Sequence, residues 1–346
     1  MEIVLVYLGK VKLPKYVLVN IKYLKKTFPK NKITFISDNV MNLDIVKLLG
    51  VNTFHCSDFY RTAPKEYLET APDLKFRGGF WFLTFARFFA INEYCERFKL
   101  NSLLHLESDV LLMKSFPFDK ISELSGLAFP LVNSGYAAAS TLFIKDHLSI
   151  STLCEFIKEQ ILVNPKTTDM DILGSPNLAK RVEITYLPIA FGGACHFEYW
   201  VSKEDHKSLC TDVQYFGGIF DGMTWGQYLT GEDPRNHYGI RKLYRNQIHH
   251  SVLINSYEIF FVNNRLYVKN EYQTFEIYSL HIHSKDKRLF KYENDYKFLN
   301  QRILDSYSGE RFEIVWTLAI KFFPLRVKNS LKIFVKSILK RVKLYK

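Results

Sequence analysis

The sequence predicts an α/β fold, because short apolar runs typical of strands alternate with longer segments of helical periodicity. The chain has 346 residues, of which 47% are hydrophobic, so it can bury a large core. In its most informative stretch the apolar run 103–106 is followed by two carboxylates one residue apart, Glu107 and Asp109. Such a run predicts a strand buried on both faces, and its acidic end is expected at the carboxyl edge of the sheet, where open α/β folds bind ligands.

The expected elements follow one another without an internal repeat or a low-complexity linker. The predicted strands are residues 3–8, 32–37, 51–55, 103–106, 141–144 and 182–187, with several more between 252 and 283; the predicted helices are 13–28, 80–98 and 147–163. The first strand, helix and second strand form a βαβ unit. A domain boundary is expected near residues 290–310, after which the basic tail of the chain begins.

The cysteines and the N-terminal residues indicate in which compartment the protein is expected. The five cysteines are odd in number and lack Cys-x-x-Cys spacing, which indicates reduced thiols in a cytosolic protein and no zinc site. The apolar run 3–8 is too short for a signal-peptide core or a membrane span. We therefore expect a cytoplasmic protein.

The net charge of +12 is concentrated at one end of the chain. Residues 311–346 hold ten Lys/Arg and one acid, Glu313, for a net charge of +9, which leaves +3 for residues 1–310. A nucleic-acid-binding protein would carry its basic patch on the folded body. The charge distribution therefore argues against nucleic acid as the partner.

The basic tail has the periodicity of an amphipathic helix. Lysines recur every fourth residue on one face, and apolar residues occupy another. The lysines are Lys328, Lys332, Lys336 and Lys340, and the apolar set is Leu331, Phe334, Val335, Ile338, Leu339 and Val342. Each Lys or Arg near an anionic lipid surface contributes roughly 1 kcal/mol, so residues 311–346 are expected to bind the inner face of the cytoplasmic membrane. The alternatives are a helix packed on the body with solvated lysines, and RNA binding by the tail.

The acidic pair and a late histidine pair make a candidate metal site. Carboxylates at a strand end suit Mg²⁺ or Mn²⁺, and such a cation can offset the charge of a departing diphosphate. In the run His281-Ile-His283-Ser-Lys285, both histidines would point to the same face of a strand, and lysines follow within reach of phosphate. Ordinary hydrogen-bonded histidines on a half-buried strand are the alternative.

A glycine-rich block covers residues 216–236. Its glycines allow close approach of a ligand, and its Trp and Tyr can stack on sugar rings, so the block suits a carbohydrate pocket; a tight turn packed by aromatics is the alternative. The block lacks the dinucleotide-binding and P-loop glycine patterns.

Taken in order, five segments resemble the GT-A-fold glycosyltransferases, most closely family 8-like enzymes and bacterial capsule and lipopolysaccharide transferases. The segments are the strand 33–37 ending in Ser-Asp38-Asn, the helix around Arg87, His-Leu-Glu107-Ser-Asp109, Asp169-Met-Asp171, and His281-Ile-His283-Ser-Lys285. The stretch 220–236 also looks like a feature of the bacterial enzymes. The resemblance spans roughly residues 1–290.

The resemblance implies a single Rossmann-type nucleotide-sugar-binding domain over residues 1–300, with a mixed central sheet, and a basic amphipathic helical tail over 301–346. It also implies a nucleotide-sugar donor, most simply a UDP-sugar, and Mn²⁺ or Mg²⁺. By position, Asp109 would coordinate the metal together with His281 or His283. Glu107 stands where such enzymes have the first Asp of Asp-x-Asp, so its longer arm suits a metal, ribose or water-mediated contact.

Donor contacts follow from the same resemblance. Tyr7, Leu8 and Asp38 would border the base, and Arg87 would reach the donor from its helix. Lys285 or Lys287 would bind the diphosphate, although the Lys-Pro-Trp that often follows the late histidine is missing.

Catalytic side chains are assigned as expectations too. Asp169 and Asp171 would face the donor sugar, with a Met between them where family 8 often has Gln. If the enzyme inverts the anomeric centre, Asp221 is the candidate general base; a retaining enzyme needs none there. The analogy favours retention, and the stereochemistry stays open.

The function expected from the sequence is transfer of a sugar to a carbohydrate or lipid-linked oligosaccharide in surface polysaccharide synthesis. Two alternatives remain. A sugar-phosphate nucleotidyltransferase should show a glycine-rich nucleotide loop after the first strand, where only Gly9-Lys10 occurs. A non-catalytic membrane-associated binding protein would explain the tail but not the acids and histidines at strand ends.

Overall fold

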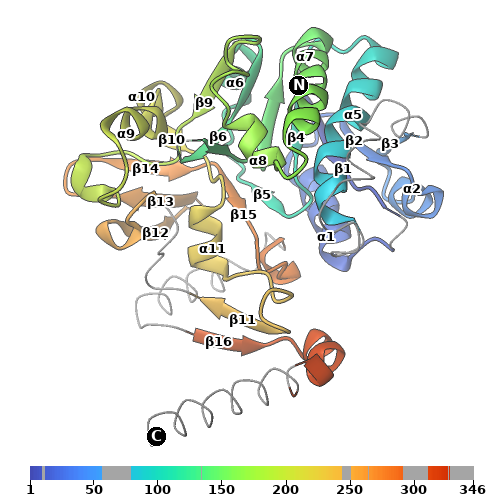
Figure 1. Ribbon diagram of the computed structural model, residues 1–346. Helices are drawn as coiled ribbons and strands as arrows, with labels where there is room; N and C mark the ends of the chain where they lie inside the picture. Colours follow the sequence, from blue (N-terminus) through green and yellow to red (C-terminus); the bar gives the residue numbers. More distant parts are fainter. Residues whose placement is uncertain are drawn as a thin grey trace, which may run out of the picture.

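The computed structural model describes residues 1–9, 12–56, 79–133, 135–243, 251–263, 265–290, 311–325 and 327 (Figure 1). The predicted boundary at residues 291–310 and the basic helix from residue 328 onward lie outside the described residues.

A mixed sheet forms the centre of the N-terminal part. Its strand order is β3-β2-β1-β4-β8-β6-β7, with β9 paired to β6. The strands are β1 (Glu2–Val6), β2 (Ile33–Ser37), β3 (Asn52–His55), β4 (Leu103–Leu106), β6 (Leu127–Asn133), β7 (Tyr136–Ala137), β8 (Thr141–Ile144) and β9 (Ile184–Leu187). Strands β3, β2, β1 and β4 are parallel, and β8 joins β4 antiparallel. The predicted α/β fold with a mixed sheet is confirmed.

Helices pack on this sheet and on the smaller sheets. The larger ones are α1 (Lys15–Thr27), α2 (Val40–Lys47), α5 (Phe80–Phe98) and α7 (His147–Val163); shorter ones are α6 (Phe118–Ser122), α8 (Asp169–Leu173), α9 (Lys203–Cys210), α10 (Val213–Phe216) and α11 (Thr224–Thr230). Helix α7 starts where Asp146 accepts the Ser149 N–H at 2.8 Å, an ordinary N-cap. Its buried face packs on α5, which the sequence predicted with the same bounds.

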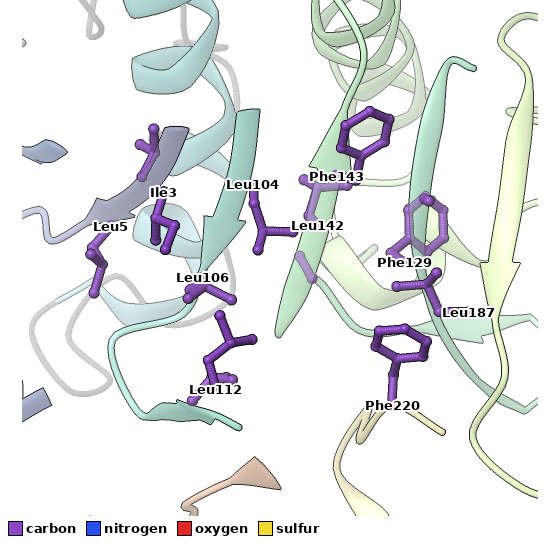
Figure 2. Packing of buried hydrophobic residues seen from close by; sticks show 14 of the residues in the cluster. Ile3, Leu5, Leu104, Leu106, Leu112, Phe129, Leu142, Phe143, Leu187 and Phe220 are labelled. Carbon is purple, nitrogen blue, oxygen red and sulfur yellow. The ribbon is translucent and has the colours of Figure 1, made fainter. Parts of the chain in front are cut away.

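The core lies between the sheet and its helices, and strands β1, β2, β4 and β8 are buried at nearly every position. Figure 2 shows Leu104, Leu142, Phe143 and Phe129 reaching across neighbouring strands, and all four are completely buried. Strand β4 is buried at every position, as the run 103–106 predicted. Burying strands on both faces is typical of sheets covered by helices on each side.

Smaller sheets extend the fold beyond the central one. One has the order β10-β14-β13-β12, formed by β10 (Gly218–Ile219), β14 (Thr274–Ile277), β13 (Arg265–Lys269) and β12 (Glu258–Val262). Strand β5 (Val110–Leu112) pairs antiparallel with β15 (Ser279–His281), and β11 (Ile240–Leu243) pairs with β16 (Arg311–Ile314). The strands predicted between 252 and 283 are present. Among them, β15 is the one that leads back to the acidic pair.

The segment after residue 310 differs from the predicted tail at its start. Residues 311–314 form strand β16 rather than part of an amphipathic helix, because β11 offers an unpaired edge to which they bond. Residues 316–325 are helical, and Gly239 allows this helix to approach closely, since a Cβ there would lie 2.5 Å from the Ala319 nitrogen. Within the described residues, no helix is long and apolar enough to span a bilayer.

Candidate active site

The acidic pair lies in the tight turn that joins β4 to β5. The Val110 N–H bonds to the Glu107 carbonyl at 3.0 Å and closes the turn. The side-chain amide of Asn20, on α1, donates to the carbonyls of Ser108 and Val110 at 3.1 and 2.9 Å. The turn is thus fixed by its own backbone bond and by Asn20 at the carboxyl end of β4, the edge that the sequence predicted.

Strand pairing brings His281 to this turn. Val110 of β5 faces His281 of β15, and the Ile282 N–H donates to the Asp109 carbonyl at 2.8 Å. The His281 Nε2 atom lies 3.1 Å from Asp109 Oδ2 and 3.3 Å from Glu107 Oε2. One ligand atom from each of Glu107, Asp109 and His281 falls within 4.8 Å of the others. This is the spacing of groups that share one ion.

The ring of His281 has a defined orientation. Its Nδ1 atom lies 3.2 Å from the Gly222 carbonyl oxygen, which can only accept a hydrogen bond. Nδ1 therefore donates to this carbonyl, and Nε2 is the ring nitrogen that faces the two carboxylates, where a bound cation would take its lone pair. Two carboxylate oxygens and one imidazole nitrogen suit a divalent cation such as Mn²⁺, so the residues present fit the predicted metal.

A buried arginine connects the acidic turn to α8. Arg87, on α5, contacts Glu107 with one guanidinium nitrogen and Asp169 with the other, the latter at 2.5 Å. Burial opposes the charge of Arg87, but the two carboxylates outweigh it and raise the pKa of Arg87. Burial likewise opposes ionisation of Glu107, yet Arg87 and His281 hold the pKa of Glu107 well below its usual range. Burial raises the pKa of Asp169, against the pull of Arg87.

Lys285 supplies a second cation to the same cluster. Its ammonium contacts Asp109 Oδ2 and lies 5.9 Å from the centre of the Tyr16 ring. The backbone of Lys285 has a φ of 55°, in the left-handed region that few non-glycine residues adopt. Lys285 thus stands beside the candidate metal ligand on a turn of constrained geometry. Lys287 lies farther on, at the start of the 3-10 turn η4 (Lys287–Phe290).

His283 lies beside the cluster and is not a member of it. Strand β15 ends at His281, so His283 falls in the turn that follows the strand. The two imidazole rings are stacked with centroids 4.0 Å apart. Of the two predicted histidine ligands, the geometry favours His281.

Asp221 is not at the surface of the site, where a general base would meet an acceptor. It is completely buried, and its carboxylate accepts the N–H groups of Trp225, Gly226 and His281 at 3.0, 2.7 and 2.8 Å. Burial raises the pKa of Asp221 to about 6, partly offset by these bonds. With both oxygens bonded to backbone and no exposed surface, Asp221 is placed to position other groups rather than to meet an acceptor.

The two predicted aspartates of α8 have different places: one belongs to the charged cluster and the other to the N-terminus of the helix. Asp169 joins the cluster through Arg87. Asp171 instead caps the helix, because its carboxylate accepts the Thr168 backbone N–H at 2.7 Å and the Thr168 hydroxyl at 2.5 Å. Both bonds are accepted by Oδ2, so the capping box occupies one of the two carboxylate oxygens of Asp171.

The residues predicted to border the base lie at the ends of β1 and β2. Both Asp38 oxygens accept the Gly9 N–H, at 3.0 and 3.2 Å, which ties the two strand ends together. Tyr7 is half-buried and Leu8 is buried. These three residues share the sheet edge at which β4 ends.

The aromatics of the glycine-rich block are core residues. Trp225 and Tyr228 are almost completely buried, and the Trp225 indole N–H donates to the Ile189 carbonyl at 2.8 Å. Their rings therefore have no face on which a sugar could stack. Of the two interpretations of this block, the packed turn is the one the structure supports.

Sequence reasoning missed two contributors. Asn20 is completely buried on the apolar face of α1, and a polar residue at such a position is itself a signal. Arg235 forms a fork with Asp233, with Nε 3.0 and 2.9 Å from its oxygens, and lies near enough to Tyr16 to lower the pKa of its hydroxyl against the dominant effect of burial. The sequence Asp-Pro-Arg, typical of a turn, could have indicated this ion pair.

No protein-family model matches the chain, and no curated protein matches it. Among solved structures, it is similar to the galactosyltransferase LgtC in complex with donor and acceptor sugar analogues, at 17% identity over 54% of this chain and 73% of LgtC, with a TM-score of 0.38. The apo glycosyltransferase GlyE of Streptococcus pneumoniae TIGR4 is 16% identical over 53% of this chain and 45% of GlyE, with a TM-score of 0.36.

A cytidylyltransferase from Leptospira borgpetersenii serovar Hardjo-bovis is 13% identical over 62% of this chain and 87% of its own length, with a TM-score of 0.34. These structural neighbours thus include two glycosyltransferases and a cytidylyltransferase. At these values the roles of individual residues rest on the geometry of this chain.

Proposed function

We propose that the chain is a metal-dependent glycosyltransferase that uses a nucleotide-sugar donor, with a UDP-sugar as the first candidate. The observation that carries this proposal is the meeting of Glu107, Asp109 and His281 at the carboxyl end of β4, within 4.8 Å of one another. Arg87 and Lys285 contact the same carboxylates. Acids, an imidazole and two cations in one place suit a ligand that carries a metal-bound diphosphate.

In this proposal Glu107, Asp109 and the His281 Nε2 atom hold Mn²⁺ or Mg²⁺. A divalent ion there would supply positive charge to a departing nucleoside diphosphate. Lys285 has a mobile side chain whose ammonium can leave Asp109 for a phosphate oxygen, because a cation beside Asp109 repels it. Arg87 keeps Glu107 ionised and oriented, since its guanidinium bonds both Glu107 and Asp169.

The acceptor is proposed to be a carbohydrate or lipid-linked oligosaccharide, met at the inner face of the cytoplasmic membrane during capsule or lipopolysaccharide synthesis. An exposed apolar stripe on the helix of residues 316–325 supports this part. Trp316, Ile320 and Phe323 are spaced as one helical face and are 71, 72 and 63% exposed. A face of this kind, followed in sequence by the lysines of the tail, fits an anionic lipid surface.

The test is donor hydrolysis by the full-length chain. The protein is incubated with a panel of nucleotide sugars and Mn²⁺, and free nucleoside diphosphate is measured. A second incubation, with sugar phosphates and nucleoside triphosphates, measures pyrophosphate. We expect release of the diphosphate, loss of it with EDTA, and recovery when Mn²⁺ is restored. Asp109→Asn should lower the rate by about 100-fold or more, because several kcal/mol of charge stabilisation depend on the ion.

The matched control is Glu258→Gln, which removes a carboxylate that is 64% exposed on β12; it should leave the rate unchanged. Pyrophosphate formed from a sugar phosphate and a nucleoside triphosphate would instead establish the nucleotidyltransferase alternative. If no panel member is bound or hydrolysed, or if Asp109→Asn keeps the wild-type rate, the proposal is wrong.

A further inference from the structure

His281 is held on three sides by residues 221–226, which we call the clamp segment. This segment joins β10 to α11 and includes the first residues of that helix. Its three contacts reach the backbone N–H, the side-chain Nδ1 and the backbone carbonyl of the same histidine. No other role for these contacts follows from the proposed function.

The first contact orients the backbone of His281. Asp221 Oδ2 accepts the His281 N–H at 2.8 Å and the Gly226 N–H at 2.7 Å, while Oδ1 accepts the Trp225 N–H at 3.0 Å. One buried carboxylate therefore ties the start of α11 to the end of β15. A carboxylate that accepts three backbone N–H groups is a strong and directional anchor.

The second contact orients the ring. The Gly222 carbonyl lies 3.2 Å from Nδ1 and can only accept. A histidine that donates one ring nitrogen to a carbonyl presents its other nitrogen, unprotonated, to a metal. Here that second nitrogen is the Nε2 atom that faces Glu107 and Asp109.

The third contact explains a glycine inside a helix. A Cβ on Gly226 would lie 1.9 Å from the His281 carbonyl oxygen and 2.6 Å from Asp221 Oδ2. Glycine in a helix interior costs about 1 kcal/mol relative to alanine, so its presence in α11 needs a compensating reason. The reason is close approach: α11 and β15 can touch at His281 only if residue 226 has no side chain.

We propose that the clamp segment is a positioning device that sets the ring orientation and tautomer of His281, so that Nε2 becomes the ligand of a divalent cation. This inference rests on the proposed function for the existence of the metal site. It gives Asp221, Gly222 and Gly226 a definite role that does not involve contact with substrate. It also explains why an acid that was a candidate general base is sealed away from solvent.

The test is metal binding, measured by electron paramagnetic resonance of Mn²⁺ titrated into the full-length protein without donor. Gly226→Ala should weaken Mn²⁺ binding by about 10-fold to 100-fold, the usual effect of disturbing the residues that orient a ligand. Because an imidazole ligand favours Mn²⁺ over Mg²⁺, the ratio of the two affinities should also fall, which a merely structural defect would not cause. His281→Ala gives the reference loss.

The matched control is Gly193→Ala, since a Cβ at Gly193 meets nothing within 4 Å and its φ is −86°. It should bind Mn²⁺ as the wild type does. Equal Mn²⁺ affinity in Gly226→Ala and wild type would overturn the inference. If the wild type itself binds no Mn²⁺, the proposed function fails instead, so the two failures are distinct.

A measurement on the wild type keeps the inference testable if Gly226→Ala does not fold. In the Mg²⁺-loaded protein, nitrogen-15 NMR of the histidine rings, assigned with His281→Gln, should show the proton of His281 on Nδ1. A proton on Nε2 would overturn the inference.

Discussion

At the scale of single residues, the site is a cluster of opposite charges that is largely buried. Arg87 is 11% exposed and stands between Glu107 and Asp169, which are 21 and 9% exposed. Such a buried group of charges adds little net stability when complete, because desolvation offsets the attraction. Removing one member of the group lowers the stability of the fold strongly, because the buried charges that remain have no partner. Arg87 therefore serves to keep two carboxylates ionised close together.

Replacing Arg87 with Met should lower the free energy of unfolding by about 3–5 kcal/mol, because Glu107 and Asp169 lose their shared cation. Urea denaturation at pH 7, followed by circular dichroism, measures this. The control is Arg181→Met, which breaks the exposed ion pair with Glu159 and should change stability little. Wild-type stability in the Arg87 variant would show that the carboxylates do not depend on this arginine.

At the scale of elements, the site is built where two short strands meet. Strand β15 carries His281 to the turn after β4, and the loop that follows β15 is tied to the C-terminal part of the chain. Arg241, on β11, contacts Asp286 at 2.6 Å and Glu313, on β16, at 3.2 Å. Arg288 also contacts Asp286 at 2.6 Å. The segment that carries Lys285 is thus anchored to β11 and β16.

This anchor should respond to pH. Burial works against an ionised Asp286, but the hydrogen bond from Arg288 and the charge of Arg241 outweigh it and lower the pKa of Asp286. The unfolded chain therefore takes up the proton at a higher pH than the folded chain does. The stabilisation is complete above the unfolded pKa of roughly 4 and is lost as the pH falls through the lowered folded value.

Asp286→Asn should accordingly lower the free energy of unfolding by about 3 kcal/mol at pH 7, with the difference from wild type shrinking below about pH 4. Urea titrations between pH 3 and pH 7 give the profile. Glu258→Gln, at an exposed pair whose nitrogen and oxygen are 3.7 Å apart, serves as the control and should show no such profile. A difference that stays constant with pH would contradict the assignment.

At the scale of the whole molecule, the end of the described chain presents an apolar face. The helix of residues 316–325 packs on the body through Ala319, which is 6% exposed, and through the ring of Phe322 against Tyr238. An adjacent face carries Trp316, Ile320 and Phe323 (Figure 1 shows this helix in red, beside the end of β16). Within the described residues, one face of the helix is thus occupied by the body, and the adjacent face is exposed.

The double variant Trp316→Ser/Phe323→Ser should bind vesicles of phosphatidylglycerol and phosphatidylcholine several-fold more weakly than wild type, since apolar burial is lost while the lysines remain. Wild-type binding should itself weaken as salt is raised, because the lysine contribution is screened. Co-sedimentation with vesicles measures both effects.

The control for this variant is Leu148→Ser, at a residue of α7 that is 74% exposed. It should bind vesicles as the wild type does. Unchanged vesicle binding in the double variant would show that the stripe does not face lipid.

The parts of the fold that could be predicted are those whose pattern is local. Helix α5, strand β4, strand β8 and helix α7 occur with the predicted bounds, because apolar runs and helical periodicity are written over neighbouring residues. Short strands such as β5 escaped notice, because three residues carry too little pattern. Strand β16 was assigned to a helical tail, since its state depends on β11, a partner distant in sequence.

For the candidate site, the residue types and the sheet edge could be read from the chain, because acids that follow a buried strand must emerge at its end. The roles of Asp221, Asp171 and Trp225 could not be read in the same way. In the sequence, an aspartate that caps a helix or accepts backbone N–H groups cannot be distinguished from one that contacts a ligand. Only the surrounding backbone decides how its oxygens are used.

The amino-acid sequence by itself determined the α/β class, most of the long elements and the position of an acidic pair at the end of β4, because these depend on interactions between near neighbours. The tertiary structure decided that His281, 172 residues after Asp109, stands beside the pair and that Arg87 balances it. It also decided that Asp221 and Gly226 hold the histidine in place. These are contacts between distant segments, and their geometry is set by strand pairing and close packing, which no local pattern encodes.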